Sequence, residues 1–321
     1  MNSQILISNL TNPTLLFFLL GIIATIVKSD LEIPRPTCKF ISLYLLFAIG
    51  FKGGQELAHS QFSSEIFYSI LFGLLIASVI PVYTFFILKQ KVSISNAGAI
   101  AATYGSVSAV TFVSAVSFLD VQQIHFGGHM VAVMALMESP AIIVGVMMMM
   151  LYQDKAENEN RNFKDILQHS ITNGSVLLIL GSLVIGFIAD TKQAEGIKPF
   201  TTDIFKGFLS LFLLEMGMVT AKRISAFKKY GLFLSFFAVV IPAINGCIVA
   251  FTSSVVSNDV GNRFMFSILA ASASYIAVPA AMRIAAPKAD PGLYLPMALG
   301  LTFPFNITLG MPTYLAIVQN F

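Results

Sequence analysis

A run of small and hydroxylated residues interrupts one of the apolar regions of the chain. Residues 103–112 read TYGSVSAVTF, with Gly105 near their centre. Hydroxyl and carbonyl oxygens are suitable ligands for Na⁺, and free backbone N–H groups at a helix start suit an anion. This stretch is therefore a candidate ion-binding segment. Its serine and threonine hydroxyls come from Thr103, Ser106, Ser108 and Thr111.

A second segment of the same kind, residues 268–285, reads ILAASASYIAVPAAMRIA. Ser272, Ser274 and Tyr275 precede Pro279, and a proline inside a helix removes a backbone hydrogen bond. Small and hydroxylated residues also let two helices pack closely, so either segment alone is equally consistent with helix packing.

Two carboxylates fall inside apolar runs, where an acidic side chain is costly and is usually functional. Glu138 lies two residues before Pro140 and is a candidate cation ligand or proton carrier. Glu215 has a second interpretation, in which it pairs with Lys222 or Arg223 near a helix end.

The composition requires a membrane protein. The chain has 321 residues, of which 56% are hydrophobic and 11% charged, and its mean hydropathy is +0.81. A net charge of +3 gives no reason to expect a nucleic-acid partner. The sequence contains no His-Glu-x-x-His motif and no Gly-x-Ser-x-Gly motif with a credible histidine, so we do not expect an enzyme.

Apolar runs long enough to cross a bilayer as helices recur along the whole chain. We expect an all-α integral membrane protein with ten transmembrane helices. The expected spans are 13–27, 40–58, 64–88, 94–117, 127–152, 172–189, 203–221, 231–256, 264–286 and 292–318.

The distribution of Lys and Arg predicts the orientation. With the N-terminus outside, fourteen of the 19 basic residues fall at the cytoplasmic ends of these spans. Both termini are then extracytoplasmic, and the polar linker 153–170 is cytoplasmic. That linker is either a solvated tether or a docking site for a regulator.

The two halves of the chain, 1–152 and 171–321, align in four places at spacings of about 161–167 residues. Gly50 matches Gly217, and Pro81 matches Pro242. A repeat of five spans must enter the membrane from opposite sides in its two copies, which gives a 5+5 inverted repeat typical of secondary transporters.

Spans four and nine have no match in this alignment, yet they occupy corresponding positions and carry the two hydroxyl-rich segments. We expect both to be broken helices that cross near the midplane, with half-helix N-termini facing an anion and oxygens facing Na⁺. The expected anion-binding residues are Gly105, Ser106, Val107, Ser108, Ala109, Ser274, Tyr275 and Ile276. The expected Na⁺ ligands are Ser108, Thr111, Glu138, Ser272 and Ser274, and no other metal is expected.

With these motifs the chain resembles the sodium-dependent bicarbonate transporter family best known from cyanobacteria. The family pattern Gly-x-Val-Ser-Gly-Ser-Thr corresponds to GSVSAVT, with Ala109 and Val110 replacing a glycine and a serine. The pattern Ser-Ser-Ser-Asp-Ile-Ser-Gly-Pro corresponds to SASYIAVP, with Tyr275 replacing the aspartate. Glu138 stands where the family has an aspartate, and Arg283 is kept.

The resemblance implies a core of spans three to five and eight to ten that moves against a gate of spans one, two, six and seven, as an elevator. It also implies a homotrimer and, in some members, a PII-like regulator at the cytoplasmic face. We expect a multi-pass protein of the bacterial plasma (inner) membrane that takes up bicarbonate or a similar small anion with Na⁺ as coupling ion. Alternatives with the same architecture are a proton-coupled transporter, an organic-anion transporter and a non-transporting sensor.

Overall fold

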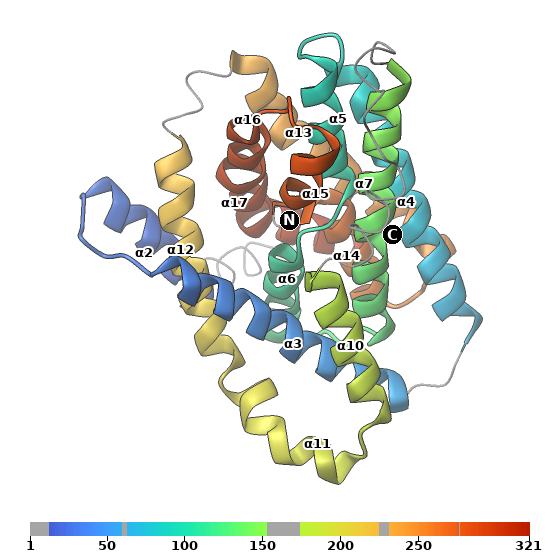
Figure 1. Cartoon of the computed structure of the whole chain (residues 1–321). Coiled ribbons are helices and arrows are strands. Elements are labelled where there is room, and N and C mark those ends of the chain that lie inside the picture. Colours follow the sequence, from blue (N-terminus) through green and yellow to red (C-terminus); the bar gives the residue numbers. More distant parts are fainter. Residues whose placement is uncertain (1–12, 60–62, 153–173, 225–230, 276) are drawn as a thin grey trace.

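The structure is a computed structural model that describes residues 13–59, 63–152, 174–224, 231–275 and 277–321 (Figure 1). These residues form helices, joined by turns and short loops, and no strands. The predicted linker 153–170 and the predicted site residue Ile276 lie outside the described ranges.

Six helical stretches of the described residues are long and apolar enough to cross a membrane, and three shorter apolar helices accompany them. The long stretches are Ser64–Leu88, Ile94–Val121, His129–Tyr152, Thr191–Lys222, Gly231–Val255 and Pro291–Asn320. The shorter ones are Leu15–Ile26, Gly174–Ile188 and Val260–Ala271. The chain is therefore a multi-pass, all-helical membrane protein.

The first half of the chain forms α2 (Pro13–Ile26), α3 (Arg35–His59), α4 (Ser64–Leu88), α5 (Ile94–Gly105), α6 (Ala109–Val121) and α7 (His129–Tyr152). The second half begins with α10 (Gly174–Ile188), α11 (Thr191–Lys198), the π-helical turn η1 (Pro199–Asp203), α12 (Phe205–Ile224) and α13 (Gly231–Thr252). It continues with the short turn η3 (Ser253–Val255), α14 (Val260–Ala271) and α15 (Ala277–Ala285). A last stretch, Pro291–Asn320, combines α16 (Pro291–Pro296), η4 (Met297–Thr302), α17 (Phe303–Phe305), η5 (Asn306–Gly310) and α18 (Met311–Asn320).

One helix begins well before its expected start. The sequence predicts a span over 203–221, but the helical chain begins at Thr191 with α11. The Asp190 carboxylate accepts a hydrogen bond from the Gln193 amide at 2.8 Å, and the Gln193 side chain accepts from the Asp190 amide. This capping box starts the helix before the apolar run begins, which a hydropathy pattern does not register.

Two pairs of helices from opposite halves pack at backbone contact. α2 packs along α12, and α3 packs along α10. A Cβ atom placed on Gly21 would lie 2.0 Å from the Leu214 carbonyl oxygen, and one on Gly217 would lie 2.0 Å from that of Phe18. Only glycine allows these helices to approach so closely.

The α3–α10 contact repeats this arrangement. A Cβ atom on Gly186 would lie 2.1 Å from the carbonyl oxygen of Phe51, and one on Gly54 would lie 2.1 Å from that of Leu183. Glycine at these four positions therefore fixes both helix pairs.

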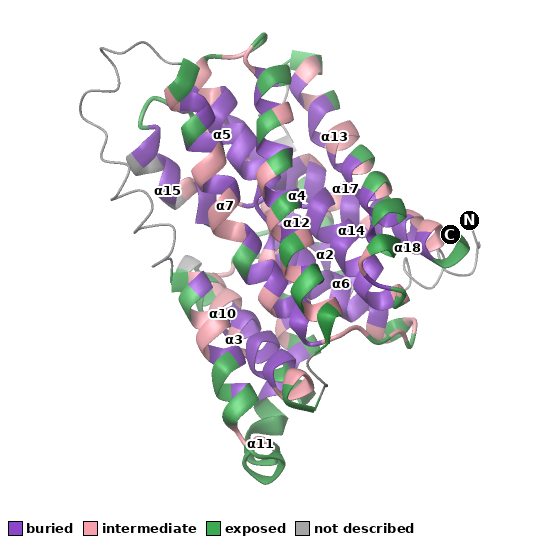
Figure 2. Ribbon diagram, turned by 90° about the vertical axis from the view of Figure 1, so that its right-hand side faces the viewer, coloured by how far each residue is buried: buried purple, intermediate pink, exposed green. Residues whose placement is uncertain are grey.

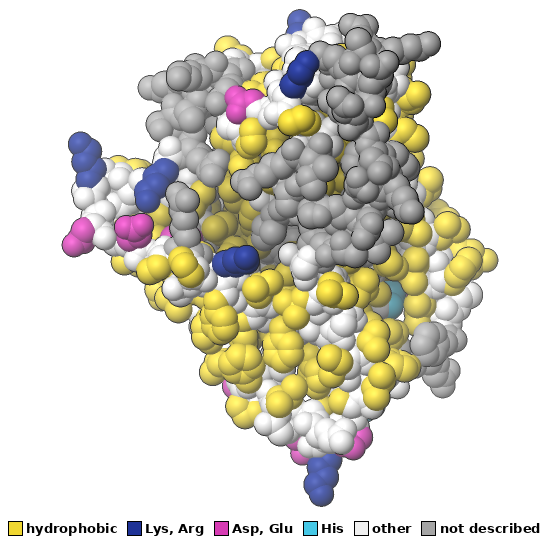
Figure 3. All heavy atoms as spheres, in the orientation of Figure 1, with side chains coloured by type: hydrophobic (Ala, Val, Ile, Leu, Met, Phe, Trp, Pro, Cys, Tyr) yellow, Lys and Arg dark blue, Asp and Glu magenta, His cyan; other side chains and the backbone are white. Residues whose placement is uncertain are grey.

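The helices on either side of the two hydroxyl-rich segments form the interior. α5, α6 and α14 are buried along nearly their whole length, whereas α11 is largely exposed (Figure 2). Figure 3 shows hydrophobic side chains spread over the lower part of the molecule, with charged side chains mainly at its extremities. Such a surface suits a bilayer, since lipid does not penalise exposed apolar side chains.

Arg263 is a basic residue that the structure buries. It lies in α14 with 6% of its surface exposed. Its guanidinium donates to the carbonyl oxygens of Ala250 at 3.1 Å and Val318 at 3.3 Å. Arg263 therefore ties α14 to the ends of two neighbouring helices.

Candidate functional site

The first hydroxyl-rich segment is a break between two helices. α5 ends at Gly105, Ser106 has extended backbone angles (φ −86°, ψ 161°), and α6 starts at Ala109. Ser108 is the N-cap of α6, and its Oγ accepts a hydrogen bond from the Thr111 amide at 3.1 Å. A serine at this position starts the second half-helix, which explains why the chain does not continue as one helix through Gly105.

The second hydroxyl-rich segment is also a break. α14 ends at Ala271, Ser272 has nearly the same extended angles as Ser106 (φ −81°, ψ 168°), and α15 starts at Ala277. The Ser272 hydroxyl donates to the Leu269 carbonyl at 2.8 Å.

The two breaks are hydrogen-bonded to each other. The Ser108 amide donates to the Ser272 Oγ at 3.0 Å, and the Ser274 amide donates to the Thr103 carbonyl at 2.8 Å. These two bonds give backbone groups of the broken helices partners inside the protein, as non-helical backbone at membrane depth requires.

A small pocket lies beside the paired breaks and collects side chains from five regions of the chain. The first break contributes Val107, Ser108 and Ala109, and the second contributes Ser274 and Tyr275. Helix α7 contributes Met134, Ala135 and Glu138, helix α3 contributes Leu46, and helix α10 contributes Ser175 and Ile179. We call this the central pocket.

The central pocket offers groups for ions of both signs. Ser108 and Ser274 are 4% and 2% exposed. The Tyr275 hydroxyl lies close to Ser108, but it is buried without a hydrogen-bond partner among the described residues. Among the residues that the structure describes, Glu138 is the one carboxylate that lines the pocket. The α6 and α15 N-termini, which carry partial positive charge, begin at residues flanking it.

Six of the predicted site residues thus line one pocket: Val107, Ser108, Ala109, Glu138, Ser274 and Tyr275. Four others do not line it. Gly105 packs against Pro81, where a Cβ atom would lie 2.1 Å from the proline Cγ. Thr111 and Ser272 are each 1% exposed, and Ser106 is buried with a hydroxyl that has no partner among the described residues.

Sequence reasoning did not find the pocket residues Leu46, Met134, Ala135 and Ile179, because an apolar residue in an apolar span carries no signal of its own. It also missed how Thr302 and Asn306 are used. Thr302 donates to the Ala238 carbonyl at 2.7 Å, and Asn306 donates to the Ala271 carbonyl at 2.7 Å. Asn306 thereby caps the C-terminal end of α14 next to the break.

Glu215, the second intramembrane carboxylate, lies away from the central pocket. It is half-buried on α12 beside the Cys38 thiol of α3, with Lys222 near enough to interact electrostatically. The pairing of Glu215 with Lys222 or Arg223 stays a prediction.

Long apolar helices and two paired helix breaks make this a multi-pass membrane protein, and its small central pocket combines apolar walls with hydroxyls and one carboxylate that suit ions. No metal-binding group of three or more His, Cys, Asp or Glu residues occurs in the described part of the chain. The family model of the Na⁺-dependent bicarbonate transporter superfamily matches residues 13–319, and the chain belongs to that family. No curated protein sequence matches the chain.

Proposed function

We propose that this protein takes up bicarbonate or a similar small anion, together with Na⁺, through the central pocket. The observation that carries the proposal is that hydroxyls from two helix breaks, the start of α6 and one carboxylate line one small pocket, with α15 starting two residues after Tyr275. Family membership supports bicarbonate as the anion and Na⁺ as the coupling ion.

In this proposal Ser108, Ser274 and Glu138 supply oxygens to Na⁺, while Tyr275 and the backbone N–H groups at the start of α6 face the anion. Bound Na⁺ offsets the negative charges of Glu138 and the anion, so each ion raises the affinity of the other. Thr111 and Ser272 hold the two breaks in shape.

We also propose the 5+5 inverted repeat of ten spans, with repeats 1–152 and 171–321. Support comes from the two helices that precede the breaks. α5 and α14 each have 12 residues and start 166 residues apart. Ser93 caps α5 by accepting from the Asn96 amide, and Asp259 caps α14 by accepting from the Asn262 amide.

The two cap asparagines are used alike. The Asn96 Oδ1 accepts from the Asp290 amide at 2.8 Å, just before α16, and the Asn262 Oδ1 accepts from the Gly127 amide at 2.7 Å, just before α7. Equivalent contacts in the two halves are what an inverted repeat produces.

The glycine contacts support the same relation for the outer helix pairs. Gly21 against Leu214 corresponds to Gly186 against Phe51. Gly217 against Phe18 corresponds to Gly54 against Leu183. The repeat equivalent of Gly217 is therefore Gly54, one helical turn from Gly50, the equivalent that the sequence alignment gives.

We propose that α4–α7 and α13–α18 form the moving core and that α2, α3, α10 and α12 form the gate. The proposed gate contributes Leu46, Ser175 and Ile179 to the lining of the central pocket. The other polar lining residues, Ser108, Glu138, Ser274 and Tyr275, belong to the proposed core. Sliding the core would therefore carry the ions past these gate residues, as an elevator mechanism requires.

The remaining proposals concern the setting of the molecule. We propose that the protein lies in the bacterial plasma membrane with both termini outside and that it forms a homotrimer. We also propose that a PII-like regulator binds its cytoplasmic face near linker 153–170. They rest on the charge distribution and on the family resemblance.

Proton coupling is the second candidate, because the Glu138 carboxylate lies in a pocket lined by the apolar residues Met134, Ala135 and Ile179. The deciding experiment measures uptake of labelled bicarbonate into proteoliposomes with a Na⁺ gradient, with a pH gradient and with neither. Uptake that needs Na⁺ supports the first proposal. Uptake driven by the pH gradient alone supports the second.

Ser108→Ala and Ser274→Ala test the pocket in the same assay. Each should reduce uptake strongly with little loss of folded protein. The matched control is Ser235→Ala, because Ser235 lies on α13 away from the lining of the central pocket and its hydroxyl donates to the Gly231 carbonyl of its own helix. Wild-type uptake by both pocket variants would refute the assignment.

A further inference from the structure

A second pocket lies between α6 and the helices α3, η1 and α12. Its lining comprises Ala48, Ile49, Lys52, Val116, Asp120, Thr201, Thr202, Phe205 and Lys206. The expected orientation places it at the extracytoplasmic end of the molecule. We call it the outer pocket.

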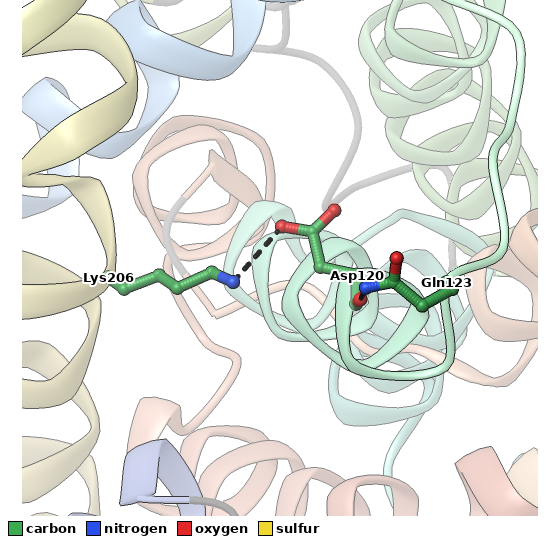
Figure 4. A network of polar contacts seen from close by, with 3 residues as sticks. All are labelled: Asp120, Gln123 and Lys206. Atoms are coloured by element: carbon green, nitrogen blue, oxygen red, sulfur yellow. Dashed lines mark hydrogen bonds and ion pairs between the residues drawn. The ribbon is translucent and has the colours of Figure 1, made fainter.

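An ion pair crosses the outer pocket. Lys206 in the first turn of α12 places its Nζ 3.5 Å from the Asp120 Oδ2 at the end of α6 (Figure 4). The Gln123 side-chain amide donates to the backbone carbonyl of Asp120 at 3.0 Å (Figure 4). Gln123 therefore does not compete with Lys206 for the Asp120 carboxylate. Both charged side chains are well exposed, and an exposed pair contributes only about 0–1 kcal/mol.

The outer pocket has more positive than negative charge. Lys52 and Lys206 both line it, and Asp120 is the one acidic residue in the described part of the chain that does. Lys52 also lines two neighbouring hollows, and Glu56, one turn further along α3, interacts with it electrostatically. Lys52 is exposed on α3, and its ammonium group makes none of the ion pairs that the described residues form within 4.0 Å.

The outer pocket and the central pocket lie along the same two helices, α3 and α6, and apolar side chains of the outer pocket come nearest to the central one in sequence. Ala48 and Ile49 lie within one turn of Leu46 along α3, and Val116 lies two turns from Ala109 along α6. Ala48, Ile49 and Val116 are apolar and at most 5% exposed. A charged ion that passes from the outer pocket to the central one along these helices therefore meets apolar side chains.

We propose that the outer pocket is a waiting site for a small monovalent oxyanion, which displaces the Asp120 carboxylate from Lys206 and is held between Lys206 and Lys52. The exchange replaces the exposed Asp120–Lys206 ion pair by an exposed pair between Lys206 and the anion, so its free-energy cost is small. The anion is then bound weakly enough to leave the outer pocket for the central one. Because Asp120 belongs to the proposed core and Lys206 to the proposed gate, the exchange also releases a contact between them. The role of this site in uptake rests on the proposed function.

Lysine reactivity tests the site without relying on transport. Purified protein is treated with a membrane-impermeant amine-acylating reagent, in sodium bicarbonate or in sodium gluconate at equal Na⁺ and ionic strength, and labelling is measured by mass spectrometry. Bicarbonate should slow labelling of Lys52 and Lys206 several-fold and leave Lys192 unchanged. Lys192 is the internal control because it is exposed on α11 and does not line the outer pocket.

Asp120→Asn should strengthen this protection, because it removes the competing carboxylate. Asp203→Asn is the matched control, since Asp203 is exposed on η1 and does not line the outer pocket. The proposal is overturned if each of the three lysines is labelled at the same rate in bicarbonate as in gluconate. It is also overturned if Asp120→Asn leaves the protection unchanged. Protection without any bicarbonate uptake would instead refute the proposed function and leave the anion site standing.

Discussion

The Ser108 amide donates a hydrogen bond to the Ser272 hydroxyl at 3.0 Å, across 164 residues of sequence. Ser108 starts α6 and Ser272 ends α14, so this bond joins a helix start in one half of the chain to a helix end in the other. The Ser272 hydroxyl is at the same time a donor to its own helix. One side chain therefore supports both breaks that form the central pocket.

Ser272→Ala should destabilise the protein, because the Ser108 amide would remain buried without an acceptor. An unsatisfied buried donor costs about 1–3 kcal/mol, so the melting temperature should fall and uptake should fall with it. Thermal unfolding in detergent measures the effect. Ser254→Ala is the control, since Ser254 is exposed and bonds only a neighbouring carbonyl, and an equal loss in both variants would remove the special role of Ser272.

Glu138→Gln should abolish the stabilisation of the purified protein by Na⁺, because no other carboxylate of the described ranges lines the central pocket. A ligand at a hundred times its Kd stabilises by about 2.7 kcal/mol, which melting curves over a Na⁺ titration resolve. Tyr275→Phe should reduce the effect only modestly, since a neutral ligand contributes less than a charged one.

Two results would contradict this assignment of Glu138. One is Na⁺ stabilisation that survives Glu138→Gln. The other is a melting temperature that responds to pH and ignores Na⁺, which would favour the proton-coupled alternative.

The topology predicts opposite labelling of two introduced cysteines. Asn160→Cys, in the predicted cytoplasmic linker, should resist an impermeant thiol reagent in intact cells, and Lys192→Cys on α11 should react. Cell lysis should make both reactive, which serves as the control. Labelling of position 160 in intact cells would invert the proposed orientation.

How much of this could be read from the sequence depends on whether a feature is local. The break after Gly105 was predictable, because Gly105, Ser106 and Ser108 combine a flexible backbone with an N-cap. The cap of α11 also has a local signal, Asp190 followed three residues later by Gln193. A span placed by hydropathy alone does not take this signal into account. These signals are confined to a few neighbouring residues.

Features that join distant segments were harder to predict. The bond between Ser108 and Ser272 needs the two breaks to meet, and nothing in either segment specifies which hydroxyl accepts. The register of α3 against α10 depends on backbone contact at Gly54, which looks no different in sequence from its neighbour Gly53. Leu46 and Ile179 enter the pocket only through this packing.

Gly217→Ala provides the last test, because it adds one methyl group where two helices touch. The new Cβ atom would lie 2.0 Å from the Phe18 carbonyl oxygen and 3.1 Å from the Gly21 Cα, so α2 and α12 must move apart. Backbone atoms cannot move aside as a flexible side chain does. We therefore expect the free energy of unfolding to fall by about 1–3 kcal/mol, as in overpacked cores. Gly54→Ala, which meets the Leu183 carbonyl oxygen at 2.1 Å, should behave alike if the two contacts are equivalent.

Gly181→Ala is the matched control, because nothing lies within 4 Å of its added Cβ atom although it sits in the same kind of apolar helix. Alanine favours a helix over glycine by about 0.5–1 kcal/mol, so this variant should be as stable as the wild type or slightly more so. The measurement is thermal unfolding of the three variants in one detergent. A stable Gly217→Ala protein would show that the close approach of α2 and α12 is not needed. A large difference between Gly217→Ala and Gly54→Ala would argue that the α2–α12 and α3–α10 pairs are not equivalent.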